Sequence, residues 1–128
     1  MRWAGPAQPC GSAQDREFDF WLGTWNLTDR TGGRNNPAGT NDITRDSTGC
    51  LIEEDYRSNV QGRSVSLFSR LDGRWHQTYI DTQGGRLVLI GSFAGGRMVL
   101  VENNTSRYVW EPLDANTVRY AGEVSRDG

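Results

Sequence analysis

Residues 74–102 read RWHQTYIDTQGGRLVLIGSFAGGRMVLVE. Three short runs rich in aliphatic, aromatic and β-branched residues are separated by Gly84-Gly85 and Gly95-Gly96, and paired glycines suit tight hairpins because they tolerate positive φ angles. Short runs with such closely spaced turns predict consecutive antiparallel strands. Neither connection can hold a crossover helix, so this stretch excludes a parallel βαβ arrangement.

The same spacing continues outward in both directions, because Gly, Asn and Asp interrupt the chain about every ten residues from position 23 onward. The predicted fold class is therefore all-β: an antiparallel up-and-down meander of about nine strands that closes into a β-barrel. The segment Asp15–Leu22 predicts one or two turns of helix before it. We expect an irregular arm over residues 1–14 and a barrel domain over residues 15–128. The predicted strands are 23–29, 40–46, 50–57, 63–70, 74–81, 86–93, 97–102, 106–111 and 117–124.

Composition narrows the class of protein further. The chain has 128 residues, which is the size of one domain, and its formal charge of -2 is spread evenly. An even distribution of charge along the chain favours neither nucleic acid nor a membrane surface as a partner. No apolar run approaches the roughly 18 residues of a membrane helix. These features predict a soluble protein without a membrane span. All 14 basic residues are Arg, which indicates a GC-rich and hence bacterial source.

Three stretches carry a resemblance to a known family: FDFWLGTW at 18–25, GCLIEE at 49–54 and GRWHQTYID at 73–81. Together they resemble a bacterial lipocalin-like (calycin-type) domain of unknown function, whose members open with Phe-Asp-Phe-Trp-x-Gly-x-Trp. The resemblance implies a lipocalin-like barrel with Trp25 packed across one end. It implies no activity, so function has to be argued from the site.

The two cysteines, Cys10 and Cys50, match no metal signature, because neither has a second Cys or a His at ligand spacing. From the residues alone, a disulfide and two unpaired thiols both remain open. The resemblance favours the disulfide, since cysteines near these two positions recur together in that family. We expect no metal and no cofactor. The protein would be periplasmic or secreted if a leader once preceded Met1, and cytoplasmic otherwise.

Alternation along the strands predicts which side chains face the lumen. An apolar interior with a few polar groups is typical of small-molecule sites, whereas narrow barrels are often filled by their own side chains. Both interpretations remain open. For the first, the expected ligand-binding residues are Trp25, Glu54, Tyr56, Trp75, Gln77, Tyr79, Leu89, Met98, Arg107 and Tyr120.

Glu54 is the candidate functional residue, because a carboxylate between inward apolar neighbours must be paired, protonated or functional. We expect its pKa to be raised unless Arg107 or Arg119 pairs with it. The only histidine, His76, should face outward.

Three functions follow from these residues. The favoured one is a barrel that binds a small hydrophobic or amphipathic ligand without converting it. The alternative is a cofactor-independent enzyme, such as a cyclase or isomerase, in which Glu54 does acid-base work and Tyr56, Gln77 or Tyr79 polarises the substrate. The third is a structural or interaction domain.

The strands at 86–93 and 97–102 are apolar on both faces. The inward face can pack in the core, so the outward face must be covered by another part of the chain or by a second molecule. We predict a symmetric homodimer through Val88, Ile90, Val99 and Val101. Related sequences continue past a segment like Ser125-Arg126-Asp127-Gly128 into a further strand, so the strand 117–124 should also be an edge. In the rival interpretation, the arm Met1–Gln14 covers the apolar patch.

Overall fold

The structure, a computed structural model, describes residues 10–126. It contains two short 3₁₀ helices followed by nine strands, which confirms the predicted all-β class and the helical start. The helices are η1 (Gln14–Arg16) and η2 (Asp19–Trp21). The strands are β1 (Gly23–Thr31), β2 (Arg34–Arg45), β3 (Ile52–Arg57), β4 (Gln61–Ser69), β5 (Arg74–Asp81), β6 (Arg86–Ala94), β7 (Arg97–Asn103), β8 (Ser106–Asp114) and β9 (Thr117–Val124).

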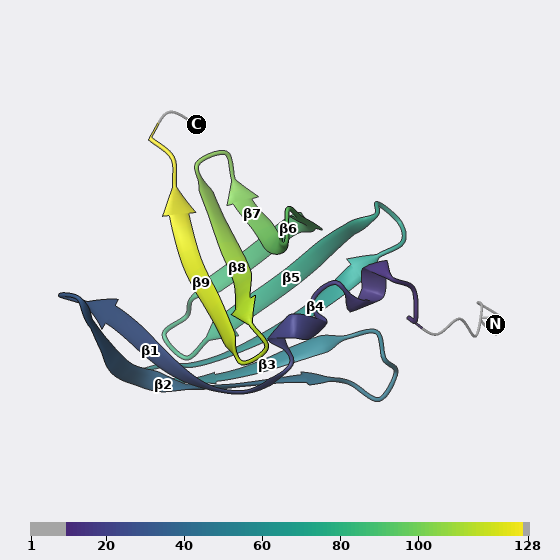
Figure 1. The fold of residues 1–128 in the computed structure, drawn as a ribbon. Coiled ribbons are helices and arrows are strands. Elements are labelled where there is room, and N and C mark those ends of the chain that lie inside the picture. Colours follow the sequence, from purple (N-terminus) through teal and green to yellow (C-terminus); the bar gives the residue numbers. More distant parts are fainter. Residues whose placement is uncertain (1–9, 127–128) are drawn as a thin grey trace.

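The nine strands form one antiparallel sheet in which each strand pairs with the next one along the chain. The sheet curls into a half-barrel, and β9 rises away from β1 instead of pairing with it (Figure 1). The predicted closure of the barrel is therefore wrong for the described residues. The two end strands, β1 and β9, are edges of this sheet, as predicted for β9.

The largest difference from the predicted strands lies in β2, which begins at Arg34 and not at residue 40. Gly32 and Gly33 both have positive φ angles, 62° and 78°, so a two-residue turn joins β1 directly to β2. Residues 34–39 are paired only with β1, because the ladder to β3 begins at Thr40. Pro37 lies in this segment, which is paired on one side only, and proline is tolerated in such edge positions because it cannot donate to a ladder on both sides.

The core lies on the concave face at the end of the sheet that the N-terminal helices cover. Phe18 is fully buried and stacks on Trp21 with ring centroids 4.7 Å apart. Its ring also meets the edges of Trp75 and Trp110 at 5.6 Å and 5.4 Å. We call this aromatic group, with the two helices, the plug. The remaining buried apolar residues of this core are Ile43, Ile52, Leu89, Met98 and Leu100.

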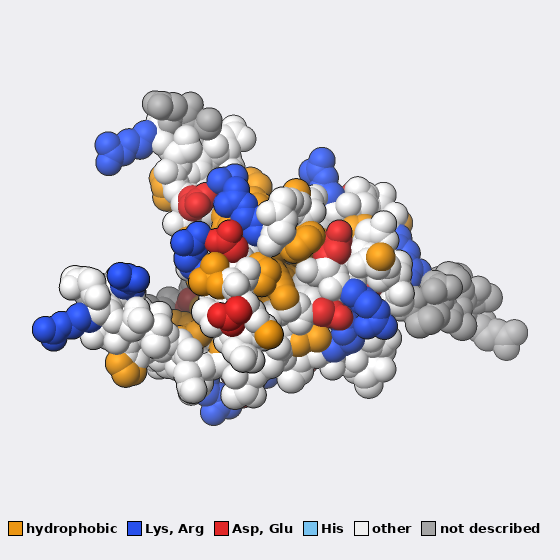
Figure 2. Space-filling view, in the orientation of Figure 1, with side chains coloured by type: hydrophobic (Ala, Val, Ile, Leu, Met, Phe, Trp, Pro, Cys, Tyr) orange, Lys and Arg blue, Asp and Glu red, His pale blue; other side chains and the backbone are white. Residues whose placement is uncertain are grey.

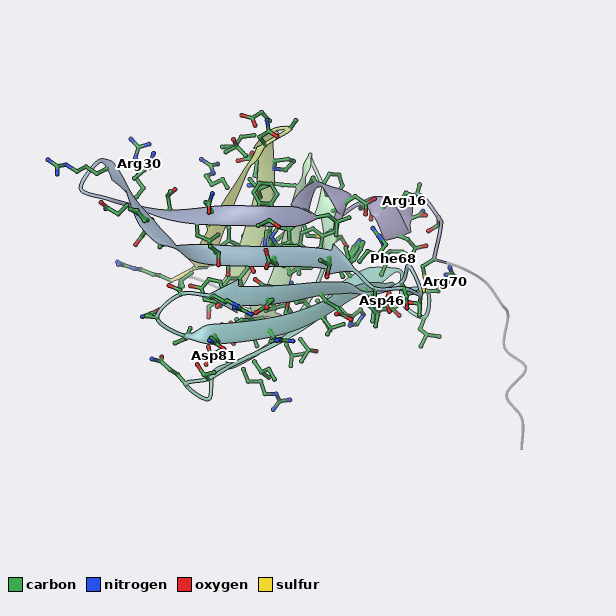
Figure 3. All side chains as sticks on the ribbon, turned by 90° about the horizontal axis from the view of Figure 1, so that it is seen from below. Arg16, Arg30, Asp46, Phe68, Arg70 and Asp81 are labelled. Atoms are coloured by element: carbon green, nitrogen blue, oxygen red, sulfur yellow. A yellow bond between two sulfur atoms is a disulfide. The ribbon has the colours of Figure 1, made fainter. Side chains whose placement is uncertain are left out.

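The plug end and the opposite end of the half-barrel are distinct in the view from below (Figure 3). Arg16, Asp46, Phe68 and Arg70 lie near the plug. Arg30 and Asp81 lie at the other end, where β1 turns into β2 and β5 runs out. The half-barrel thus has one end that the helices cover and an opposite end that they do not reach (Figure 3).

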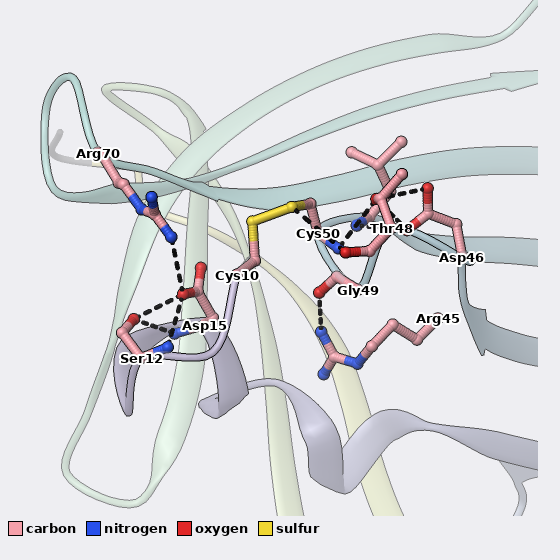
Figure 4. The surroundings of a disulfide bond; sticks show 10 residues. Cys10, Ser12, Asp15, Arg45, Asp46, Thr48, Gly49, Cys50 and Arg70 are labelled. Atoms are coloured by element: carbon pink, nitrogen blue, oxygen red, sulfur yellow. Dashed lines mark hydrogen bonds and ion pairs between the residues drawn. A yellow bond between two sulfur atoms is a disulfide. The ribbon is translucent and has the colours of Figure 1, made fainter. Parts of the chain in front are cut away.

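A disulfide between Cys10 and Cys50 joins the segment before the plug to the turn before β3 (Figure 4). This confirms the predicted pairing. Beside it, buried Asp15 accepts hydrogen bonds from the backbone N–H and the hydroxyl of Ser12, at 3.0 Å and 2.6 Å. Arg70 forms an ion pair with the same carboxylate. The plug is therefore fastened by covalent and polar links as well as by apolar packing.

The convex face carries the outward residues that alternation predicts. Val88, Ile90 and Val101 are exposed, Val99 is partly buried, and Ile90 lies directly opposite Val101 in the ladder. Their outward placement is confirmed. His76 also faces outward, within 2.7 Å of Asp72. Residues 1–9 of the arm that could cover the patch lie outside the described residues.

Charged side chains of both signs lie side by side over β8 and β9 on the surface seen in Figure 2. Two cross-strand ion pairs join these strands: Arg107 with Glu123 at 2.7 Å, and Arg119 with Glu111 at 2.5 Å. Within the described part of the chain, none of the helices has the length and apolar character that crossing a membrane requires.

Candidate functional site

Beyond the plug, the concave face carries a group of polar side chains on three neighbouring strands. Asn41 of β2, Glu54 of β3 and Ser64 of β4 share this face, because Glu54 pairs directly with Ser64 and lies diagonal to Asn41. The amide Nδ2 of Asn41 donates to one Glu54 oxygen at 2.8 Å, and the Ser64 hydroxyl donates to the other at 2.6 Å. Both oxygens of the carboxyl are thus held by neutral donors.

Burial raises the pKa of Glu54 above its usual value, and the hydrogen bonds from Ser64 and Asn41 oppose that rise only in part. Across residues 10–126, no ion pair with an arginine involves this carboxyl. The direction of the pKa shift agrees with the sequence prediction. The predicted arginine partner is wrong, because Arg107 and Arg119 bind other carboxylates on the opposite face.

Asn41 adds a second unusual group beside Glu54. The residue is 6% exposed, and its Oδ1 has no hydrogen-bond donor among the described residues. An unsatisfied buried carbonyl is costly, by about 1–3 kcal/mol, and such atoms are rare in folded proteins. Asn41 lies directly between Trp25 and Tyr56 in the ladder. The concave face therefore presents a hydrogen-bond acceptor next to an acidic side chain.

All four tyrosines of the chain lie on this same face, and none is fully buried. Tyr56 neighbours Asn41, while Tyr79 pairs with Ser64 and donates to Asp81 at 3.2 Å. Tyr108 and Tyr120 stack with ring centroids 6.0 Å apart. We call the set of Asn41, Glu54, Ser64, Tyr56, Tyr79, Tyr108 and Tyr120 the concave cluster.

Two glycines make room for these rings. A Cβ on Gly62 would come within 2.4 Å of the Tyr79 hydroxyl, so the ring lies directly over the bare backbone of β4. A Cβ on Gly122 would come within 3.2 Å of the Tyr108 ring. Glycine at these two strand positions is typical of sites where a group must approach the backbone closely.

Two tyrosines of the cluster have raised pKa values. Burial, reinforced by a hydrogen bond to Asp81 and by the charge of Glu54, raises the pKa of Tyr79 to about 12. Burial also raises the pKa of Tyr120, with contributions from Tyr108, Glu54, Tyr79 and Tyr56, although 54% of the residue remains exposed. Ladder register places Tyr120 of β9 and Glu54 of β3 on the same, concave face of the curled sheet.

The concave cluster contains four of the ten predicted site residues: Glu54, Tyr56, Tyr79 and Tyr120. Trp25 lies on the same face but is directed toward the plug, since its indole N–H donates to the Trp21 carbonyl at 2.7 Å. Four others are packed in the interior and have little exposed surface: Trp75, Gln77, Leu89 and Met98. Gln77 donates to the Ser66 hydroxyl at 2.9 Å. Arg107 lies on the convex face and is not part of the cluster.

Sequence reasoning missed three members of the cluster: Asn41, Ser64 and Tyr108. The sequence did indicate the orientation of Asn41, because it lies two residues before buried Ile43 in β2 and so points to the same face of the sheet. Ser64 likewise alternates with outward-facing Arg63 and Val65. Small polar residues carry no hydrophobic signal, so alternation alone does not single them out.

A shallow hollow of about 210 Å³ lies on the convex face and is lined by Arg97, Val109, Glu111, Arg119, Ala121 and Glu123. It is smaller than typical ligand pockets of roughly 300–1,000 Å³. Ion pairs within the hollow or beside it already engage Arg119 and both acids. The polar groups of this hollow are therefore less available to a ligand than those of the concave cluster.

Over residues 10–126, no group of three His, Cys, Asp or Glu side chains is placed to hold a metal ion.

Comparison of the chain with models of protein families and with curated proteins finds no match.

Replacing Glu54 by Gln tests the state of its carboxyl. A raised pKa means that the folded protein holds its proton more tightly than the unfolded chain, so raising the pH through the folded pKa removes stability. We expect Glu54→Gln to abolish this decline and to raise the free energy of unfolding at pH 7.5 relative to wild type. Urea unfolding from pH 4 to pH 8 measures the free energy of unfolding of wild type and variant. A wild-type stability that rises over this range, and a variant that is less stable at pH 7.5, would contradict the assignment.

Proposed function

We propose that this protein is a lipocalin-like (calycin-type) domain that binds a small amphipathic or aromatic ligand on its concave face. The observation that carries the proposal is the Oδ1 of Asn41, which has no hydrogen-bond donor among the described residues, beside the partly buried carboxyl of Glu54. Such a pair gains a hydrogen bond when a donor group of a ligand reaches it. The exposed portions of the tyrosine rings supply apolar surface next to these polar groups, which is the usual composition of a small-molecule site.

The core architecture supports this placement of the ligand. The plug fills one end of the half-barrel with buried aromatic rings, so a ligand has no room there. The concave cluster lies on β2 to β5 and on β8 and β9, and its tyrosines keep part of their surface exposed. One end therefore stabilises the fold, and the other end offers polar and aromatic groups for binding.

A neutral aromatic alcohol, naphthol, is a suitable first probe, because it combines one hydrogen-bond donor with an apolar body. We expect saturable binding of one molecule per chain, and a fluorescence titration measures it. Leu87→Trp should weaken binding by about tenfold or more, since Leu87 pairs with Tyr79 on the concave face and a larger ring there occupies the ligand's space.

Ile80→Trp is the matched control for this experiment. Ile80 follows Tyr79 in β5, projects from the convex face outside the proposed dimer patch and is exposed, so the same side chain there should leave the affinity unchanged. Equal loss in both variants would show that the effect is not specific to the concave face. The absence of saturable binding to the folded wild type would overturn the proposed site for this class of ligand.

A second candidate function is acid-base catalysis by Glu54 as a cofactor-independent cyclase or isomerase. The observation that favours it is the raised pKa of this carboxyl, because a general acid or base works best when its pKa lies near the operating pH. Tyr56 and Tyr79 are the neighbouring groups that could polarise a substrate. Conversion of a bound ligand by the wild type and its loss in Glu54→Gln would distinguish catalysis from binding alone.

We also propose that the protein forms a symmetric homodimer through Val88, Ile90, Val99 and Val101. A twofold interface needs a self-complementary patch, and these side chains lie next to one another on two paired strands. We expect Ile90→Asp to convert a dimer to a monomer in light scattering at micromolar concentration. Ile80→Asp, at an exposed position of β5 outside the patch, should leave the dimer intact. A monomeric wild type would rule the interface out.

A further inference from the structure

We propose that the ligand of the concave cluster is an organic ammonium ion: a primary or secondary amine with an apolar or aromatic body. This inference rests on the proposed binding function and adds the chemical class of the ligand. Three observations carry it: the distribution of charge between the two faces, the hydrogen-bonding groups left open around Glu54, and the rings that surround them.

The first observation is that Glu54 and the arginines of β3 to β9 are on opposite faces of the sheet. Alternation and ladder register place the strand arginines from β3 onward on the convex face. These seven residues are Arg57, Arg63, Arg74, Arg86, Arg97, Arg107 and Arg119. Arg45 of β2 shares the face of Glu54 but is bound at the plug end, where it donates to the Gly49 carbonyl and pairs with Asp19. Within residues 10–126, the side-chain partners of Glu54 are Asn41 and Ser64, and no ion pair joins Glu54 to a cationic side chain.

Without such a partner, the charged form of Glu54 is costly in the protein alone. Tyr56 on its own strand, Tyr79 of β5 and Tyr120 of β9 lie on the same face, and burial raises the pKa of Tyr79 and of Tyr120, so these two phenols carry no charge at pH 7.5. The other strand neighbours, Asn41 and Ser64, carry no charge. An ammonium ion supplies the missing counter-charge, whereas a carboxylate or phosphate would place a second negative charge beside the first.

The second observation concerns hydrogen bonds. Glu54 and the Oδ1 of Asn41 are neighbouring acceptors, and the two donors beside them, Asn41 Nδ2 and the Ser64 hydroxyl, are already used. An ammonium group has up to three N–H donors and no acceptor, so it complements two adjacent acceptors. An alcohol offers one donor and adds an acceptor of its own. Charge-assisted hydrogen bonds to a carboxylate are also stronger than neutral ones.

The third observation is that electron-rich rings share the concave face with the acceptors. Tyr56 neighbours Asn41 and Tyr79 pairs with Ser64, while Tyr108 and Tyr120 lie on the same face in β8 and β9. A cation near the face of such a ring is attracted by its quadrupole, and the attraction grows as water is removed. The same rings provide apolar contact for the body of the ligand. Charge, hydrogen bonding and ring faces thus select the same chemical class.

The test compares three probes that share one body: phenylbutylamine, phenylbutanol and phenylbutyrate, titrated calorimetrically at pH 7.5. The amine should bind about tenfold or more tightly than the alcohol, and the acid should show no saturable binding. Glu54→Gln should reduce the amine's affinity to that of the alcohol. Glu53→Gln is the matched control, because the neighbouring carboxylate is exposed on the convex face, and it should bind the amine like wild type.

The outcomes separate this inference from the function on which it rests. If the alcohol binds as tightly as the amine, or if Glu54→Gln keeps the full affinity for the amine, the ammonium class is wrong and the binding function stands. If none of the three probes binds a wild type that circular dichroism shows to be folded, both are wrong. Should Glu54→Gln fail to fold, the ratio of amine to alcohol affinity on the wild type alone decides the question.

Discussion

Removing the disulfide by the double substitution Cys10→Ser and Cys50→Ser should lower the free energy of unfolding by about 4 kcal/mol. The bond closes a loop with a sequence separation of 40 residues. In the chain-entropy model, freeing a loop of this length increases the entropy of the unfolded chain by roughly that amount. For a domain whose total stability is of order 5–15 kcal/mol, this loss is a large fraction.

Urea unfolding with and without reductant measures this effect. Reduced wild type should unfold at the same urea concentration as the double variant, and reductant should leave the variant unchanged. If wild type unfolds at the same midpoint in both conditions, the bond contributes nothing measurable and the helices are held by other contacts. Mass spectrometry after alkylation provides the chemical control, because the oxidised protein should carry no alkylated cysteine.

Phe18→Ala should cost about 3–5 kcal/mol, as expected for deleting a fully buried aromatic side chain. Phe18 is 0% exposed and contacts the rings of Trp21, Trp75 and Trp110, so its removal leaves a cavity at the centre of the plug. Tryptophan fluorescence during urea unfolding reports the change directly, because three of the neighbouring rings are indoles.

Leu71→Ala is the control for the loss of an apolar side chain as such. Leu71 is 99% exposed in the turn before β5, so its truncation should change stability by less than about 0.5 kcal/mol. A small effect of Phe18→Ala, comparable to that of Leu71→Ala, would mean that the helices do not close the core. Full-length protein is used throughout, and circular dichroism establishes that each variant is folded before it is unfolded.

Much of the fold followed from local sequence patterns, for identifiable physical reasons. Paired glycines marked turns because they accept backbone angles that other residues avoid, and Gly95 and Gly96 indeed have positive φ. Alternation placed Glu54 and Tyr79 on one face and His76 on the other. The start of β2 was missed because Pro37 and the polar residues around it are typical of loops, whereas here they lie in a strand paired on one side only.

The candidate site was less predictable than the fold because it depends on contacts between distant strands. Glu54 stood out as an acid between apolar neighbours, but nothing local indicated that Asn41, 13 residues earlier, would bind it in place of an arginine. The closure of the sheet was mispredicted for a related reason. Whether first and last strands meet depends on the total twist and curl of nine strands, which no single segment encodes.

The sequential order of the strands bears on how the chain folds. Each ladder joins neighbours in the chain, so the sheet can grow hairpin by hairpin without first closing a long loop. Topologies with such local contacts fold faster than β-sandwiches whose strands pair across the sequence. The plug is different, because the indole N–H of Trp75 donates a hydrogen bond to the Glu17 carboxylate, 58 residues earlier in the chain. We therefore expect hairpins to form early and the aromatic end to dock late, as the step that makes folding of the whole domain cooperative.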